Sequence, residues 1–122
     1  MDAQFLTTAS PVSITTDLHG GVPVICVSGE IDMSNERTVG EHISDQVGQR
    51  PGAVVLDLSG ITFMGSSGIR LLLDAHSSTC SAGTRMVVVA DHQPVLRPLA
   101  IAQVDRVLHL RADVTAALAA CA

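Results

Sequence analysis

The 122-residue sequence contains no lysine, tryptophan or tyrosine, and its seven basic residues are all arginine. The absence of lysine excludes a P-loop, whose lysine reaches the bound phosphates, and it excludes Schiff-base chemistry. The net charge is −5 and aromatic residues make up only 2% of the chain. Nucleic-acid binding needs clustered basic residues and often stacking aromatics, so this class of function is set aside.

Because aromatic residues are scarce while hydrophobic residues reach 47%, the core must be aliphatic. The length suits one domain over residues 1–122, with residues 1–11 expected to be a flexible N-terminal segment.

No apolar run approaches the roughly 20 residues that cross a bilayer, and the N-terminus does not resemble a signal peptide. We therefore expect a cytoplasmic protein without membrane association. The mean hydropathy of +0.40 predicts a sizeable apolar contact surface.

Cys26, Cys80 and Cys121 are widely spaced and form no CxxC motif. This pattern is neither a disulfide framework nor a zinc site. We interpret the cysteines as small hydrophobic residues, with a redox-sensing thiol pair as the alternative. The five histidines show no HxxxH or HExxH pattern, so the sequence predicts no metal site and no cofactor.

Alternating or continuous apolar residues, bounded by glycine and proline, predict the strands. The expected strands are 12–16, 22–27, 53–58, 85–90 and a short extended piece within 104–110. Helices are expected between them, which predicts an α/β domain with a mixed sheet of four to five strands and about four helices. Asp57 is expected to hydrogen-bond loop backbone at the end of its strand.

The expected helices each carry a start signal or an apolar stripe. Ser34 is the expected N-cap of the first helix, Pro94 suits the first turn of the third, and Asp113 suits the cap of the last, 114–120. Pro98 is expected to interrupt or kink the third helix. The stripe of the first helix is Val39, Ile43 and Val47, and that of the second is Ile69, Leu72, Leu73, His76 and Cys80.

Gly65-Ser66-Ser67-Gly68 precedes the second helix and places two hydroxyls between flexible residues. One interpretation is helix capping by a serine side chain, which contributes roughly 1 kcal/mol. A hydrolase needs a G-x-S-x-G elbow with an oriented histidine and acid, and this turn is one residue short. A phosphoacceptor needs only exposure, and at a helix N-terminus the phosphate charge is tolerated by the helix dipole. A partner docked over the turn would have to desolvate that phosphate, so modification would switch binding off.

Three blocks of the sequence resemble the STAS domain, specifically the bacterial anti-sigma factor antagonists. They are VSGEID (Val27 to Asp32), VVLDLSGITFMGSSGIRLLL (Val54 to Leu73) and MVVVAD before the third helix. The resemblance covers nearly the whole chain. It implies a non-enzymatic protein that captures an anti-sigma factor and thereby frees the sigma factor.

The resemblance also implies a site. In the family the first serine of a D-S-S-G or D-S-T-G turn is phosphorylated by the anti-sigma factor, which is a serine kinase, and a phosphatase resets the switch. That serine falls on Ser66, and the acidic residue after the second strand falls on Asp32. The expected oligomeric state is a monomer that forms a heterocomplex. The expected partner-binding residues are Asp32, Ser34, Gly65, Ser66, Ser67, Gly68 and Arg70.

This chain departs from the family pattern at Gly65, where the family carries aspartate. The turn is therefore less negative and more flexible, which leaves two rivals open. The first is a STAS module that binds its partner without phosphorylation and is controlled by the redox state of the cysteines. The second is a STAS-like module that binds a small ligand such as a nucleotide, or a scaffold in a larger signalling complex.

Overall fold

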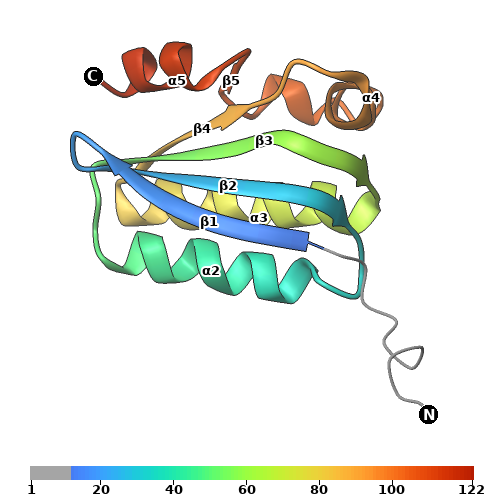
Figure 1. Cartoon of the computed structure of the whole chain (residues 1–122), viewed down its shortest axis with the longest axis horizontal. Coiled ribbons are helices and arrows are strands. Elements are labelled where there is room, and N and C mark those ends of the chain that lie inside the picture. The colour runs from blue at the N-terminus through green and yellow to red at the C-terminus, as the bar shows by residue number, and fades with distance from the viewer. Residues whose placement is uncertain (1–11) are drawn as a thin grey trace.

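A computed structural model describes residues 12–122 as a five-stranded mixed sheet with helices on both faces (Figure 1). The strand order is β1-β2-β3-β4-β5, with β1 antiparallel to β2 and the other neighbours parallel. The strands are β1 (Val12–His19), β2 (Val22–Ile31), β3 (Ala53–Met64), β4 (Arg85–Val89) and β5 (Leu110–Arg111). The helices are α2 (Glu36–Gly48), α3 (Ser66–Ala82), α4 (Gln93–Ile101) and α5 (Val114–Cys121), with a 3-10 turn η1 (Val104–Arg106). The predicted fold class is confirmed; the prediction for residues 1–11 lies outside the described residues.

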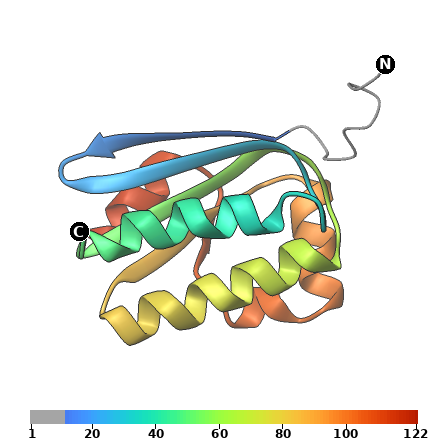
Figure 2. The same cartoon turned by 90° about the horizontal axis from the view of Figure 1, so that it is seen from below.

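The sequential strand order explains how the helices are layered. The helices α2, α3 and α4 each connect one parallel strand to the next, and crossovers of the same hand place all three on one face of the sheet. Figure 2 shows α2 and α3 side by side across that face. Their side of the sheet holds the larger apolar cluster, which includes Leu56, Leu72 and Leu99. The smaller cluster on the other face includes Val55 and Ala117 of α5.

The strands β2 and β3 run further than the sequence predicts, to Ile31 and Met64. Gly60 permits the extension, because a Cβ atom there would lie 2.6 Å from the Cβ of Ser28 on the neighbouring strand. The β2–β3 register also shifts in this region, between Cys26 and Ser28. Glycine in a strand marks such close approaches of backbone, so reading it as a strand end was wrong.

Asp57 consequently lies within β3 and not at its end. Its carboxylate accepts hydrogen bonds from the backbone N–H of Ser59 at 3.0 Å and from the Ser59 hydroxyl at 2.7 Å. The expectation of a bond to backbone was correct, but the expected position at a strand end was wrong.

The first helix, α2, is not capped by Ser34, which corrects the prediction. The N-cap is Asn35, and the Ser34 hydroxyl donates instead to the Asp32 carboxylate at 2.5 Å. Asn35 is buried and ties the turn to β2, accepting from the Asp32 N–H at 3.1 Å and donating to the Glu30 carbonyl at 2.7 Å. The turn between β2 and α2 is therefore closed by its own side chains.

The buried face of α3 also differs from the predicted stripe. Leu73 and Cys80 are exposed, whereas Leu71, Ala75 and Thr79 are buried. The face is shifted because α3 packs against both α2 and the sheet, so that small residues are selected at the helix–helix contact. The predicted stripe of α2, Val39, Ile43 and Val47, is buried as expected.

The C-terminal third agrees with the sequence at two helix starts and at the short extended piece, and it differs at one proline. Pro94 lies in the first turn of α4, and Asp113 caps α5 by accepting from the Ala116 N–H at 2.8 Å. Pro98 does not interrupt α4, which continues to Ile101. The segment 104–110 begins with the turn η1 and ends with Leu110 in strand β5, as the sequence predicts.

Candidate functional site

The serine turn lies where the C-terminal ends of β2 and β3 meet the start of α3. Met64, the last residue of β3, pairs with Ile31, the last residue of β2. The next N–H group, that of Gly65, donates to the Ile31 carbonyl at 3.1 Å. Gly65 is extended (φ −84°, ψ −173°) and is the N-cap of α3, so neither serine caps the helix through its side chain. The capping interpretation of the serine pair is therefore wrong.

The two serines of the turn differ in exposure. Ser66 is the first residue of α3 and is exposed, whereas the Ser67 side chain is only 4% exposed. Within residues 12–122 the Ser66 hydroxyl has no protein hydrogen-bond partner, and the first turn of α3 carries no acidic residue. The first turn of α3 therefore supplies no negative charge of its own to the positive end of the helix dipole, which lies beside an accessible hydroxyl.

Gly68 holds the turn against the sheet. A Cβ atom at this position would overlap the Cγ atom of Met64 and lie 3.3 Å from Cγ2 of Ile31. The helix therefore starts closer to the strand ends than any residue with a side chain allows. This close approach fixes the direction in which α3 leaves the sheet and, with it, the outward position of Ser66.

Asp32 lies directly after Ile31, and Ser66 lies directly after Gly65, so the Gly65–Ile31 hydrogen bond brings the two residues to the same edge of the sheet. The Asp32 carboxylate accepts from the Ser34 N–H at 2.9 Å as well as from its hydroxyl. Arg70, one turn into α3, pairs with Glu36 of α2 at 3.1 Å. The predicted partner-binding residues are therefore assembled at one end of the domain.

Comparison with known proteins places this geometry in a family. The STAS domain family matches residues 13–117. This chain is a STAS domain.

Two relatives from Mycobacterium carry the name anti-sigma factor antagonist. The anti-sigma-F factor antagonist RsfB of Mycobacterium tuberculosis is 34% identical over 104 residues, covering 84% of each chain. The crystal structure of an anti-sigma factor antagonist from Mycobacterium paratuberculosis superimposes with a TM-score of 0.85 at 31% identity, covering 91% of this chain and 94% of that one. The unphosphorylated anti-sigma factor antagonist SpoIIAA shares the fold at 17% identity, with a TM-score of 0.71 over 85% of this chain and 92% of its own.

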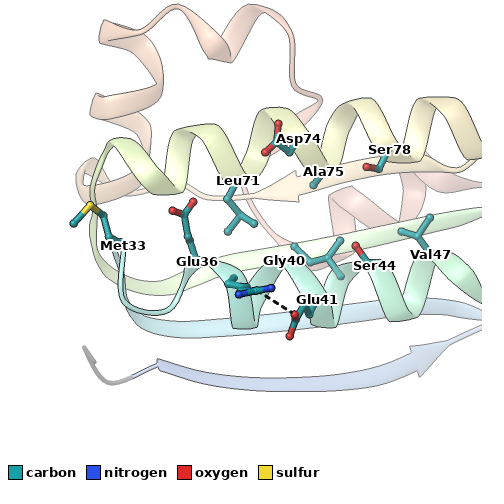
Figure 3. A pocket seen from close by; sticks show the side chains of 12 residues that line it. Met33, Glu36, Gly40, Glu41, Ser44, Val47, Leu71, Asp74, Ala75 and Ser78 are labelled. Carbon is teal, nitrogen blue, oxygen red and sulfur yellow. Dashed lines mark ion pairs between the residues drawn. The ribbon is translucent and has the colours of Figure 1, made fainter. Parts of the chain in front are cut away.

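A second surface feature of the STAS domain is a groove of about 460 Å³ between α2 and α3 (Figure 3). Its floor is apolar and narrow, because Gly40 of α2 faces Leu71 of α3. Its rim carries the carboxylates of Glu36, Glu41 and Asp74, and the dashed line in Figure 3 marks the ion pair of Glu41 with Arg37 at 3.5 Å. Glu36 is paired with Arg70 and Glu41 with Arg37, so Asp74 is the rim carboxylate without an ion pair within residues 12–122. The rim therefore holds no surplus of cations that would bind the phosphates of a nucleotide.

Two of the three cysteines of the STAS domain, Cys26 and Cys121, do not have the properties of redox sensors, whereas Cys80 is exposed. Burial raises the pKa of the Cys26 thiol, and the nearby Asp57 carboxylate, 3.7 Å from the sulfur, raises it further. Burial likewise raises the pKa of Cys121. A raised pKa keeps a thiol protonated, whereas redox-sensing cysteines have low pKa values and open access. The interpretation of Cys26 and Cys121 as partly buried hydrophobic residues fits these surroundings better.

Two further searches of the described part of the chain gave negative results. Between residues 12 and 122, no group of three or more histidine, cysteine, aspartate or glutamate side chains is placed to hold a metal ion. Over the same residues, no helix is both long enough and apolar enough to cross a membrane.

Sequence reasoning missed four residues near the serine turn: Met33, Phe63, Arg97 and Ile101. Met33, Phe63 and Ile101 are exposed by 83%, 51% and 75%, although all three are large and apolar. The signal for Arg97 and Ile101 was present, since they lie one helical turn apart on the face of α4 opposite the buried Val95 and Leu99. Phe63 occupies an outward position of β3, beyond residue 58, where the predicted strand ends.

Proposed function

We propose that this STAS domain is a non-enzymatic anti-sigma factor antagonist that is switched off by phosphorylation of Ser66. It binds an anti-sigma factor through the edge formed by the ends of β2 and β3 and the start of α3. The antagonist role is supported by the names of the relatives, which share up to 34% of their residues with this chain. The bound anti-sigma factor then releases its sigma factor.

The exposure of Ser66 beside the buried Ser67 is the observation that carries the choice of residue. A kinase must bring the hydroxyl oxygen to the terminal phosphate of ATP, and only the exposed hydroxyl can reach it. The phosphate adds about −1.5 to −2 charges and three acceptor oxygens at the N-terminus of α3, where the helix dipole and free N–H groups favour negative charge. The domain thus keeps its fold, whereas a partner docked over the turn would have to desolvate the phosphate and therefore binds more weakly.

The kinase in this proposal is the anti-sigma factor itself, and a phosphatase restores the binding form. Incubation of the chain with its anti-sigma factor, ATP and Mg²⁺, followed by mapping of phosphopeptides by mass spectrometry, tests the site. We expect phosphate on Ser66 and none on Ser67. The variant Ser66→Ala should take up no phosphate and should bind the anti-sigma factor constitutively. Phosphate on Ser67 alone would refute the assignment.

One observation favours a second candidate, an antagonist that binds without being phosphorylated. Gly65 replaces the aspartate that precedes the serine in the family pattern, so no carboxylate stands at the N-cap to orient the Ser66 hydroxyl. Under this alternative the chain binds its anti-sigma factor, yet the kinase assay leaves Ser66 unmodified. Restoring the carboxylate with Gly65→Asp would then restore phosphorylation.

A further inference from the structure

A second groove, of about 500 Å³, lies between the serine turn and α4. Ser66 itself lines it, together with the last residues of β3, the first turn of α3 and the outer face of α4. The groove is mainly apolar, and the side chains that matter here are Phe63, Ile69, Pro94, Pro98 and Ile101. It therefore joins the proposed phosphorylation site to an apolar surface.

The outer face of α4 leaves apolar groups in solvent although the same helix has a buried face. Val95 and Leu99 are 0% exposed, whereas Ile101 is 75% exposed at the far end of the groove. Phe63 is 51% exposed on the opposite wall. Single exposed apolar residues are ordinary, but apolar residues gathered around one groove mark a binding surface.

The charge of the groove selects the kind of partner. Arg97 is the one charged residue among the groove residues, and in the described part of the chain it forms no ion pair or side-chain hydrogen bond. The N-terminus of α3, with its partial positive charge, opens on the same groove. The charge that lines this groove is therefore positive, whereas the net charge of the whole chain is −5.

We propose that this groove binds an apolar segment of the anti-sigma factor that carries a carboxylate, and that Arg97 pairs with that carboxylate. The apolar side chains of the segment cover Phe63 and Ile101, and its carboxylate lies between Arg97 and the start of α3. The inference rests on the proposed function, and it adds the groove, the cation and the chemistry of the docked segment.

Phosphorylation and docking exclude each other in this arrangement. A phosphate on Ser66 enters the groove beside the position of the partner carboxylate, so the two negative groups repel each other. The phosphate also competes for Arg97, the cation that the docked segment requires. The partner is therefore displaced without any change in the fold of the STAS domain.

The test is the affinity of groove variants for the purified anti-sigma factor that binds the wild-type chain, measured by calorimetry. Arg97→Glu and Ile101→Asp should each weaken binding at least about tenfold, since each places a negative charge against the docked segment. The matched controls are Arg106→Glu, at an exposed position of η1, and Leu18→Asp, 72% exposed at the far end of β1. Both controls should bind within about twofold of wild type, because surface changes outside an interface are nearly neutral. Thermal unfolding of all four variants shows that they are folded.

Several results would overturn the inference. If the groove variants bind like the controls while phosphoserine at position 66 still blocks binding, the groove is not the docking site and the proposed function stands. If no anti-sigma factor binds the wild-type chain, the proposed function fails and the inference fails with it. If Ile101→Asp dissociates a dimer of the wild-type chain in sedimentation equilibrium, a second copy fills the groove. If deletion of residues 1–11 raises the affinity about tenfold, the chain's own N-terminal segment fills it.

Discussion

Two adjacent serines have opposite surroundings at the start of α3. Successive helical residues point about 100° apart, so a residue at the border of the buried face can be covered while its neighbour is exposed. Gly68, Leu71 and Leu72 bury their side of the helix, which turns Ser67 inward and Ser66 outward. The sequence alone allows either serine to be the exposed one, and the choice of Ser66 came from the family pattern.

Gly65 offers a direct test of the departure from that pattern. Its φ of −84° suits any residue, and a Cβ atom would lie 3.5 Å from Phe63, which is an ordinary contact. We expect Gly65→Asp to raise the free energy of unfolding by a few tenths of a kcal/mol, up to about 1 kcal/mol, because aspartate caps the helix and complements its dipole. Urea denaturation measures this change, and a loss of stability would show that the turn does not have this geometry.

Gly68 should respond in the opposite way. We expect Gly68→Ala to lower the free energy of unfolding by about 1–3 kcal/mol, because the new methyl group collides with buried Met64. The matched control is Gly48→Ala at the end of α2, where a Cβ atom meets nothing within 4 Å. The control should gain up to about 1 kcal/mol from helix propensity, measured by the same denaturation. Equal effects of the two substitutions would contradict the close approach of α3 to the strand ends.

At the scale of elements, α5 depends on its cap. It is an eight-residue helix on the less covered face of the sheet, and isolated helices of this length are not stable in water. We expect Asp113→Ala to cost about 1 kcal/mol, because it removes the acceptor of the Ala116 N–H, while Asp113→Asn should stay within a few tenths of a kcal/mol of wild type. Hydrogen exchange of α5 amides measures the local effect; equal protection in both variants would refute the role of the cap.

The elements also show what the sequence can and cannot specify. Apolar periodicity located every strand of the sheet and the stripe of α2, because period and burial are local signals. It misplaced the end of β3 at Gly60. This position must be glycine because Ser28 of the neighbouring strand lies too close for a side chain, and such a contact between strands is not visible in the local sequence. It misplaced the buried face of α3 for the same reason: the face is chosen by α2, from another part of the chain. The serine turn was found because glycine and serine are concentrated there. The outer face of α4 also has a sequence signal, but its position beside the serine turn depends on the fold and leaves no trace in the sequence.

At the scale of the whole molecule, the alkaline stability profile should report the thiols. The chain has no lysine or tyrosine, so cysteines dominate its titration above about pH 8.5. The pKa values of Cys26 and Cys121 are raised in the folded chain above the ordinary 9.0. The folded state therefore holds these protons more tightly than the unfolded state, and the stabilisation is complete below about pH 9 and is lost as pH rises through the folded-state values.

We accordingly expect the Tm of the wild-type chain under reducing conditions to fall as the pH rises above about 9. The double variant Cys26→Ala, Cys121→Ala, which keeps exposed Cys80, should lose less of its Tm over the same range. Scanning calorimetry measures both profiles. Parallel profiles would mean that Cys26 and Cys121 are not the groups responsible.

The central claim is that Ser66 gains a phosphate without disturbing its own domain and thereby loses its partner. The most direct measurement uses chain with phosphoserine incorporated at position 66, for which both the Tm and the affinity for the anti-sigma factor are determined. The account predicts a Tm within about 2 °C of the unmodified chain and an affinity reduced by about a hundredfold or more, corresponding to roughly 3 kcal/mol. An unchanged affinity would contradict it, and so would a lost affinity accompanied by unfolding of the domain.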